Sequence, residues 1–413
     1  MLKGVPPYVS MFTHKGPVAP FFVALGVALS QPLGMPDILT ARMLFCVVGC
    51  LTAAALYLFI TRLTISPRAG ILGVLPFLAC YPFTFGATAG PEPKLPMLLF
   101  VVLSFYLASR RRWFWAGFTG CLAAFTWQPT AVFPTITLLL AILQPAPARR
   151  RAVLGVLAGG LIPAAAIIGY FIERNALPAF LHRFLLFNVT QLDRGVPSLL
   201  AHVRLPYEVI TRDYRLMLVP LGLGLVGLAG IYIRQARSYR SWRDLRDDPY
   251  ALLLLSFPLP ILWSLKDFQA ATDFYVFLPY LTLGFGWLAD ETLSQLSAGK
   301  RPAWVQGALF VSICLAFLGL TVFYNLARRN WELDSHLQAA QRVIERFGPD
   351  VRVLARGRPY VLALLGKTSP TPIMNCNYVF DLEMERFPGG YEAVSYTHLR
   401  AHETPEHLVC RLL

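Results

Sequence analysis

Apolar residues in this chain occur in long runs that short polar segments separate. The runs are about 16 to 23 residues long and nearly free of charge, as are helices that cross a bilayer. We expect about ten spans, with bounds near 42–61, 70–88, 95–109, 113–128, 130–145, 152–172, 215–233, 250–265, 273–290 and 303–325. The pattern predicts an all-α polytopic membrane protein.

The apolar segment at 17–33 differs from these runs because Pro20 and Pro32 interrupt it. A short segment with internal prolines is typical of an interfacial or re-entrant helix. The residues before it are polar and rich in proline, unlike a secretory signal. We therefore expect an interfacial helix on the outer face.

Basic residues gather in short loops between alternate spans, at 62–69, 110–112, 149–151, 234–249 and 300–301. If the first of these loops is cytoplasmic, alternation places all five on the same side, as the positive-inside rule requires. The outer face then receives the remaining polar segments, which are residues 1–41, 90–94, 173–214, 265–272 and the tail from 326.

Composition agrees with this topology. Hydrophobic residues make up 56% of the 413 residues and charged residues 15%, against about 25% charged in soluble domains. A net charge of +14 can indicate a nucleic-acid partner, but basic residues gather in the short loops between spans, so the membrane topology explains the charge and no nucleic-acid partner is needed. The seven cysteines show no disulfide framework, and no metal-ligand cluster is visible.

The composition changes after Asn325. Helical periodicity at 328–347 and a short strand at 351–355 predict a small α/β appendage over 326–393, on the outer face and truncated. Residues 394–413 resemble the translation of a transposase sequencing adapter. We expect them to be disordered and to lie outside the natural protein, which leaves residues 1–325 as the membrane domain.

Charged residues are absent from the middle of the predicted spans and collect at the outer face. Ion-coupled transporters usually carry ionisable groups or broken helices near the midplane. An enzyme that acts at the outer face is therefore favoured. A transporter or lipid flippase, and a non-catalytic scaffold whose tail binds partners, are the alternatives.

Glu92 is the candidate catalytic residue. It lies in the tight outer loop Gly90–Lys94, where a carboxylate could accept hydrogen bonds from a sugar or act as a general base. The alternatives are a solvated side chain or one paired with Lys94. Other substrate-proximal candidates at this face are Tyr8, Lys94, Gln269, Asp273 and Tyr275.

Three cations at the outer face are candidates for binding a lipid phosphate: His14, Lys15 and Lys266. An ammonium at the membrane interface suits a phosphate, and two cations stabilise a departing phosphate better than one. The alternatives are a lysine that snorkels at the interface and ordinary loop charge.

The first residues also carry a resemblance. Gly4-Val-Pro-Pro-Tyr8 and Thr13-His-Lys-Gly-Pro17 resemble the first outer loop of the GT-C superfamily of polyprenyl-phosphate-sugar glycosyltransferases. That superfamily includes protein O-mannosyltransferases, aminoarabinose transferases (ArnT) and RgtA-like enzymes. The later elements of the resemblance follow in the family's order: Arg42, Glu92, Lys266 and Tyr275–Pro279.

The resemblance implies an inverting transfer of a sugar from a polyprenyl-phosphate donor to a lipid, glycan or protein hydroxyl. It implies a bacterial inner membrane protein whose active site faces the periplasm, with no certain cofactor and room for a divalent cation. In the family a further span and a catalytic aspartate precede the first outer loop. Because Met1 falls after that point, we expect a chain truncated at both ends and an inactive fragment of an active enzyme.

Overall fold

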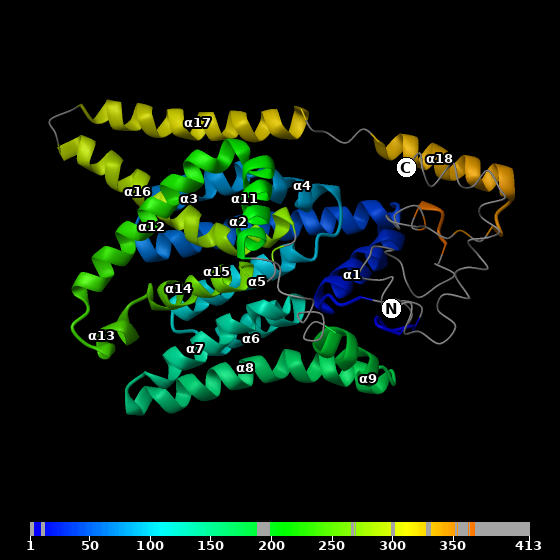
Figure 1. Cartoon of the computed structure of the whole chain (residues 1–413), viewed down its shortest axis with the longest axis horizontal. Helices are drawn as coiled ribbons and strands as arrows, with labels where there is room; N and C mark the ends of the chain where they lie inside the picture. The colour runs from blue at the N-terminus through cyan, green and yellow to red at the C-terminus, as the bar shows by residue number, and fades with distance from the viewer. Residues whose placement is uncertain are drawn as a thin grey trace. The chain divides into compact units, whose positions relative to one another are not determined.

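The computed structural model describes residues 4–9, 13–187, 199–265, 268, 270–298, 302–327, 332–351, 353, 362 and 364–367. Every regular element in these ranges is helical (Figure 1), which confirms the predicted all-α polytopic fold class. The residues of the predicted strand at 351–355 lie mainly outside the described ranges. The boundary between the membrane domain and the tail stays a prediction, as does the adapter-like segment 394–413, which is not described.

The chain divides into two compact units. The larger contains Lys15–Tyr170 and Gln191–Arg329; the smaller contains Met1–His14, Phe171–Thr190 and Asn330–Leu413. The helices before residue 188 are α1 Val18–Leu33, α2 Asp37–Thr64, α3 Pro67–Ala79, α4 Tyr81–Ala89, α5 Lys94–Ser109, α6 Trp113–Thr126, η1 Gln128–Ala131, α7 Val132–Ile142, α8 Ala146–Glu173, α9 Leu177–Phe180 and η2 Leu181–Leu186.

The remaining helices follow after residue 198 and include the two 3-10 helices η4 and η5. They are α11 Leu199–Asp213, η4 Arg215–Met217, α12 Leu218–Ser238, α13 Trp242–Asp247, α14 Ala251–Ser256, α15 Pro258–Ser264, η5 Ala271–Phe277, α16 Leu278–Ala298, α17 Ala303–Ala327 and α18 Glu332–Phe347. A helix coincides with each predicted span and with the segment at 17–33.

Four helical stretches in the described ranges are individually long and apolar enough to cross a membrane, and the bent pair α3–α4 makes a fifth if it is one span. The four are Asp37–Thr64, Ala146–Glu173, Arg215–Ser238 and Trp304–Ala327. Other apolar helices, among them α1, α5 and α14–α15, are shorter or interrupted. The count of about ten spans therefore stays a prediction.

Proline divides two of the predicted spans. The run at 70–88 forms α3 and α4, which are bent by 67° at Cys80. Pro82 lacks an N–H and its ring clashes with the preceding turn, so the first helix ends and the second begins with this proline in its first turn. In the same way α14 ends at Ser256 and α15 begins at Pro258. The predicted spans at 70–88 and 250–265 are therefore each formed by two helices.

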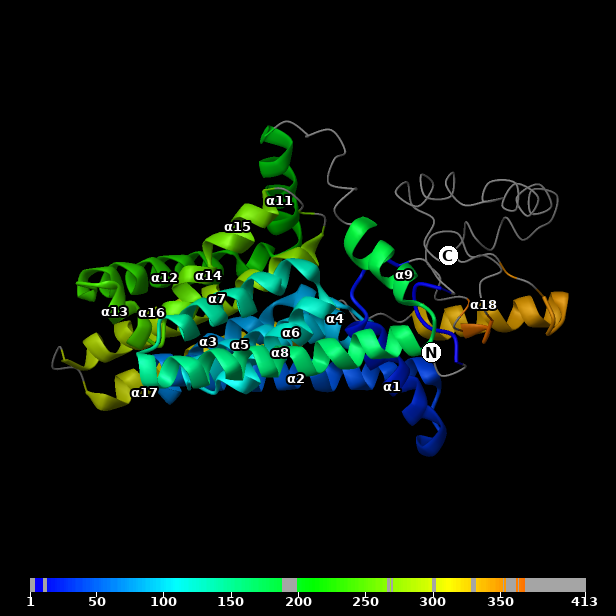
Figure 2. The ribbon, with the colours of Figure 1, turned by 90° about the horizontal axis from the view of Figure 1, so that it is seen from below.

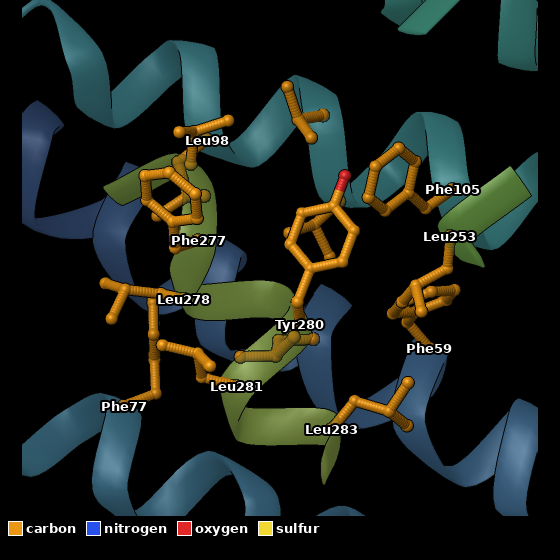
Figure 3. Close-up of a cluster of buried hydrophobic side chains, with 14 of the residues drawn as sticks. Phe59, Phe77, Leu98, Phe105, Leu253, Phe277, Leu278, Tyr280, Leu281 and Leu283 are labelled. Atoms are coloured by element: carbon orange, nitrogen blue, oxygen red, sulfur yellow. The ribbon is translucent and has the colours of Figure 1, made fainter. Parts of the chain in front are cut away.

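The core of the larger unit forms around α16, which packs against α12 and α3, while α2 packs against α3 and α5. Figure 2 shows these helices running side by side. Tyr280 lies fully buried among apolar side chains of α2, α5, α14 and α16 (Figure 3). Its hydroxyl lies 2.7 Å from the Ser256 hydroxyl, so the one polar atom of this side chain is paired.

Helices α12 and α16 approach so closely that only glycine fits between them. A Cβ at Gly227 would lie 2.0 Å from the carbonyl oxygen of Gly284, and one at Gly284 would lie 2.0 Å from that of Gly224. Small residues at such crossings let two backbones come into contact, which is how helices often associate in lipid. These glycines set the position of α16, and η5 directly precedes α16 in the chain.

Gly227→Ala should lower the free energy of unfolding by about 1–3 kcal/mol, because the new methyl group forces the two backbones apart. Gly222→Ala on the same helix is the matched control: no described heavy atom lies within 4 Å of its Cβ position, and alanine favours helix. The midpoint of thermal unfolding in detergent measures both. Equal midpoints for the two variants would contradict the close crossing.

Candidate functional site

An ion pair joins two segments that are far apart in the sequence at one end of the larger unit. Lys94, the first residue of α5, donates from its Nζ to Oδ1 of Asp273 in η5. The side chains are 16% and 7% exposed, so the pair is largely shielded from water. The predicted alternative of a Lys94–Glu92 pair is replaced by this contact.

The local structure of η5 holds the Asp273 carboxylate in place. Its Oδ2 accepts a hydrogen bond from the N–H of Ala270 at 2.8 Å, which caps the start of η5. The hydroxyl of Tyr214, which follows α11, donates to the carbonyl of Ala271 at 2.6 Å. Asp273 therefore faces Lys94 from a segment that is fixed on both sides.

Glu92 lies at the N-terminus of α5, where Pro93 precedes the first helical residue. Its Oε1 accepts a hydrogen bond from the backbone N–H of Lys94 at 3.1 Å, and the positive end of the helix dipole favours a carboxylate there. The side chain is half-buried. Glu92 thus contacts the backbone of Lys94, while the Lys94 ammonium contacts Asp273.

Tyr275 lies beside Glu92, against α4. The Cβ position of Gly86 is 2.7 Å from the Tyr275 hydroxyl and 3.5 Å from Cβ and Cγ of Glu92. Tyr275 is fully buried, and its hydroxyl donates to the carbonyl oxygen of Pro82 at 2.5 Å. The structure therefore brings together four of the predicted residues from two segments: Glu92, Lys94, Asp273 and Tyr275.

Two tryptophans that sequence analysis did not select complete this cluster. Nζ of Lys94 lies 4.8 Å from the ring centroid of Trp127, within the range of a cation–π interaction. Trp127 meets Trp263 edge to face, with centroids 6.2 Å apart and an interplanar angle of 87°. The available signal was that each tryptophan ends a predicted span on the outer side.

Lys15 is exposed at the start of the larger unit. The next residue, Gly16, is buried so tightly that its Cβ position lies 2.0 Å from the carbonyl oxygen of Phe125 and 2.6 Å from that of Thr126. Trp127 directly follows Thr126. Lys15 therefore lies at the end of α6 that carries Trp127, at the same end of the bundle as the ion pair.

Tyr8 and His14 belong to the smaller unit. Tyr8 is fully buried, with its ring 5.5 Å from those of Phe171 and Phe180, and its carbonyl accepts a hydrogen bond from Arg183. Its φ of +71° is unusual for a bulky residue, and burial raises the pKa of its phenol. The His14 ring lies 5.9 Å from that of Phe187. Both assignments to the site stay predictions.

Two further predicted residues, Lys266 and Gln269, lie outside the described residues. Across the part of the chain that the structure describes, no group of three or more His, Cys, Asp or Glu side chains is close enough to hold a metal ion. The cluster itself offers a half-buried carboxylate, a paired lysine and aromatic surfaces.

Comparisons with known proteins place the fold. No family model matches the chain, and no curated protein sequence matches it. Among solved structures, ArnT from Cupriavidus metallidurans in the apo state is similar over 87% of this chain and 75% of its own, with a TM-score of 0.56 and 14% identity.

A second similar structure is the archaeal oligosaccharyltransferase AglB from Archaeoglobus fulgidus, in complex with an inhibitory peptide and a dolichol-phosphate. The similarity covers 89% of this chain and 58% of AglB, with a TM-score of 0.50 and 12% identity. The chain is thus a multi-pass helical membrane protein whose fold is similar to those of ArnT and AglB.

Proposed function

We propose that this chain is the membrane part of a glycosyltransferase that moves a sugar from a polyprenyl-phosphate donor to a lipid, glycan or protein hydroxyl. The observation that carries this proposal is the grouping of Glu92 with Lys94, Asp273 and Tyr275 at the end of a GT-C bundle that also bears Lys15. The similar AglB structure, which contains a dolichol-phosphate, supports a lipid-linked donor. The proposed location is the outer face of a bacterial inner membrane.

In the proposed reaction Glu92 removes the proton from the acceptor hydroxyl as that oxygen attacks the anomeric carbon. The bond from the anomeric carbon to the phosphate oxygen breaks, and its electron pair leaves with the polyprenyl phosphate. Attack opposite the leaving group inverts the anomeric centre. Lys15, with the neighbouring His14 and with Lys266 as further candidates, neutralises the charge that develops on the phosphate.

Lys94 has a supporting role in this scheme. Its ammonium is held by Asp273 and by the ring of Trp127, while its backbone N–H holds the carboxylate of Glu92. The residue therefore links the proposed base to the aromatic cluster. We assign the donor phosphate to Lys15, whose side chain is exposed, whereas the side chain of Lys94 is only 16% exposed.

Lys15→Ala should weaken binding of undecaprenyl-phosphate sugars about 10-fold or more, because a hydrogen bond between charged groups is lost. The measurement is a titration of the purified chain in lipid nanodiscs with these lipids. Arg151→Ala, which removes an exposed cation from the predicted inner face, is the matched control. Unchanged affinity in Lys15→Ala, or no binding by the wild type, would overturn the proposal.

A further inference from the structure

The indole N–H of Trp263 is a buried hydrogen-bond donor. Its Nε1 is shielded from solvent and has no hydrogen-bond partner among the described residues. A buried tryptophan N–H usually finds a partner, because a buried donor without a hydrogen bond destabilises the protein. A group outside the described chain that accepts a hydrogen bond would remove this destabilisation.

The surroundings of Trp263 suit a small ring with both apolar and polar faces. Trp263 and Trp127 stand at 87° to one another and form an aromatic corner, and both side chains are half-buried rather than enclosed. Lys94 and Asp273 border the corner through the contact of Lys94 with Trp127. Indole faces, an unused donor and a nearby carboxylate match the C–H face and the hydroxyl groups of a monosaccharide.

The position of this aromatic corner relative to Lys15 indicates which part of the donor it binds. Gly16 packs on the carbonyl groups of Phe125 and Thr126. Lys15 directly precedes Gly16 and Trp127 directly follows Thr126, so both residues adjoin this contact. In a polyprenyl-phosphate donor the sugar is bonded to the phosphate itself. A phosphate at Lys15 therefore brings the donor sugar, rather than a lipid chain, to the aromatic corner.

We propose that Trp127 and Trp263 form the donor-sugar subsite, in which the Trp263 N–H donates a hydrogen bond to a hydroxyl of the monosaccharide. This inference rests on the proposed function. A polyprenyl tail offers no hydrogen-bond acceptor for the Trp263 N–H, and the phosphate group is assigned to Lys15 and the other candidate cations. The sugar is the part of the donor whose chemistry fits both indoles.

The test compares two ligands, undecaprenyl phosphate linked to a hexose or a pentose and the same lipid phosphate without a sugar. We expect the wild type to bind the sugar-bearing lipid more tightly. Trp263→Phe keeps an aromatic ring but removes the N–H, so it should weaken binding of that lipid about 3- to 10-fold, as for one lost hydrogen bond. Its affinity for the sugar-free lipid should stay unchanged.

Trp304→Phe is the matched control, since Trp304 is 72% exposed and should leave both affinities as they are. Removing an unpaired donor should not lower the midpoint of thermal unfolding, so a fold defect would be visible separately. If both lipids bind but Trp263→Phe keeps the full preference for the sugar, the subsite is wrong and the proposed function stands. If the wild type binds neither lipid, the proposed function fails and the subsite with it.

Discussion

Asp273→Ala is expected to lower the free energy of unfolding by about 3–5 kcal/mol, the usual cost of leaving one charge of a buried ion pair uncompensated. The Asp273 side chain is 7% exposed and that of its partner Lys94 is 16% exposed, so water can replace little of what the carboxylate provides. The variant also loses the cap on the N–H of Ala270. Equilibrium unfolding in mixed micelles with increasing denaturing detergent measures the loss.

Two control variants separate the loss of the Asp273 charge from the loss of its hydrogen bond with Ala270 and from the effect of removing any carboxylate. Asp273→Asn can still accept the hydrogen bond from Ala270, so the stability that it loses reports mainly the ion pair. Glu208→Ala breaks an exposed pair with Arg204, whose side chains are 52% and 75% exposed, and should stay close to the wild type. If Asp273→Ala were no less stable than Glu208→Ala, the Lys94–Asp273 pair would not be buried in the protein.

The hydrophobic pattern predicted the fold class because each run of apolar residues is long enough to form a helix whatever it packs against. It did not predict where helices stop inside a run. The bend at Cys80 and the break between Ser256 and Pro258 depend on prolines that a membrane helix sometimes tolerates. Tertiary packing decides which of them divide a helix, and one sequence does not reveal that packing.

The sequence predicted that the site residues share a face of the membrane, but not their contacts. Alternation of the spans predicts one face for Glu92, Lys94, Asp273 and Tyr275, and the structure brings the four close together. The partner of Lys94 lies 179 residues away, whereas the nearby Glu92 was the expected alternative. Trp127 and Trp263 were missed because tryptophan at the end of a span is ordinary in membrane proteins.

In an active form of the enzyme, Glu92→Gln is expected to lower the rate of sugar transfer about 100- to 10,000-fold, the usual contribution of a general base. Glutamine has nearly the same shape, and its side-chain oxygen can still accept the hydrogen bond from the Lys94 N–H that Glu92 accepts at 3.1 Å. The start of α5 should therefore be preserved. What the substitution removes is the negative charge that takes the proton of the acceptor hydroxyl.

The kinetic pattern distinguishes a base from a structural cap. A base acts in the transition state, so kcat should fall while the affinity for the donor lipid and the thermal unfolding midpoint stay near those of the wild type. A residue that only caps α5 would give the opposite pattern, with transfer retained by Glu92→Gln and both transfer and stability reduced by Glu92→Ala. Measuring kcat, donor affinity and unfolding for these two variants beside the wild type decides between the roles, because only the carboxylate charge differs between Glu92→Gln and the native protein.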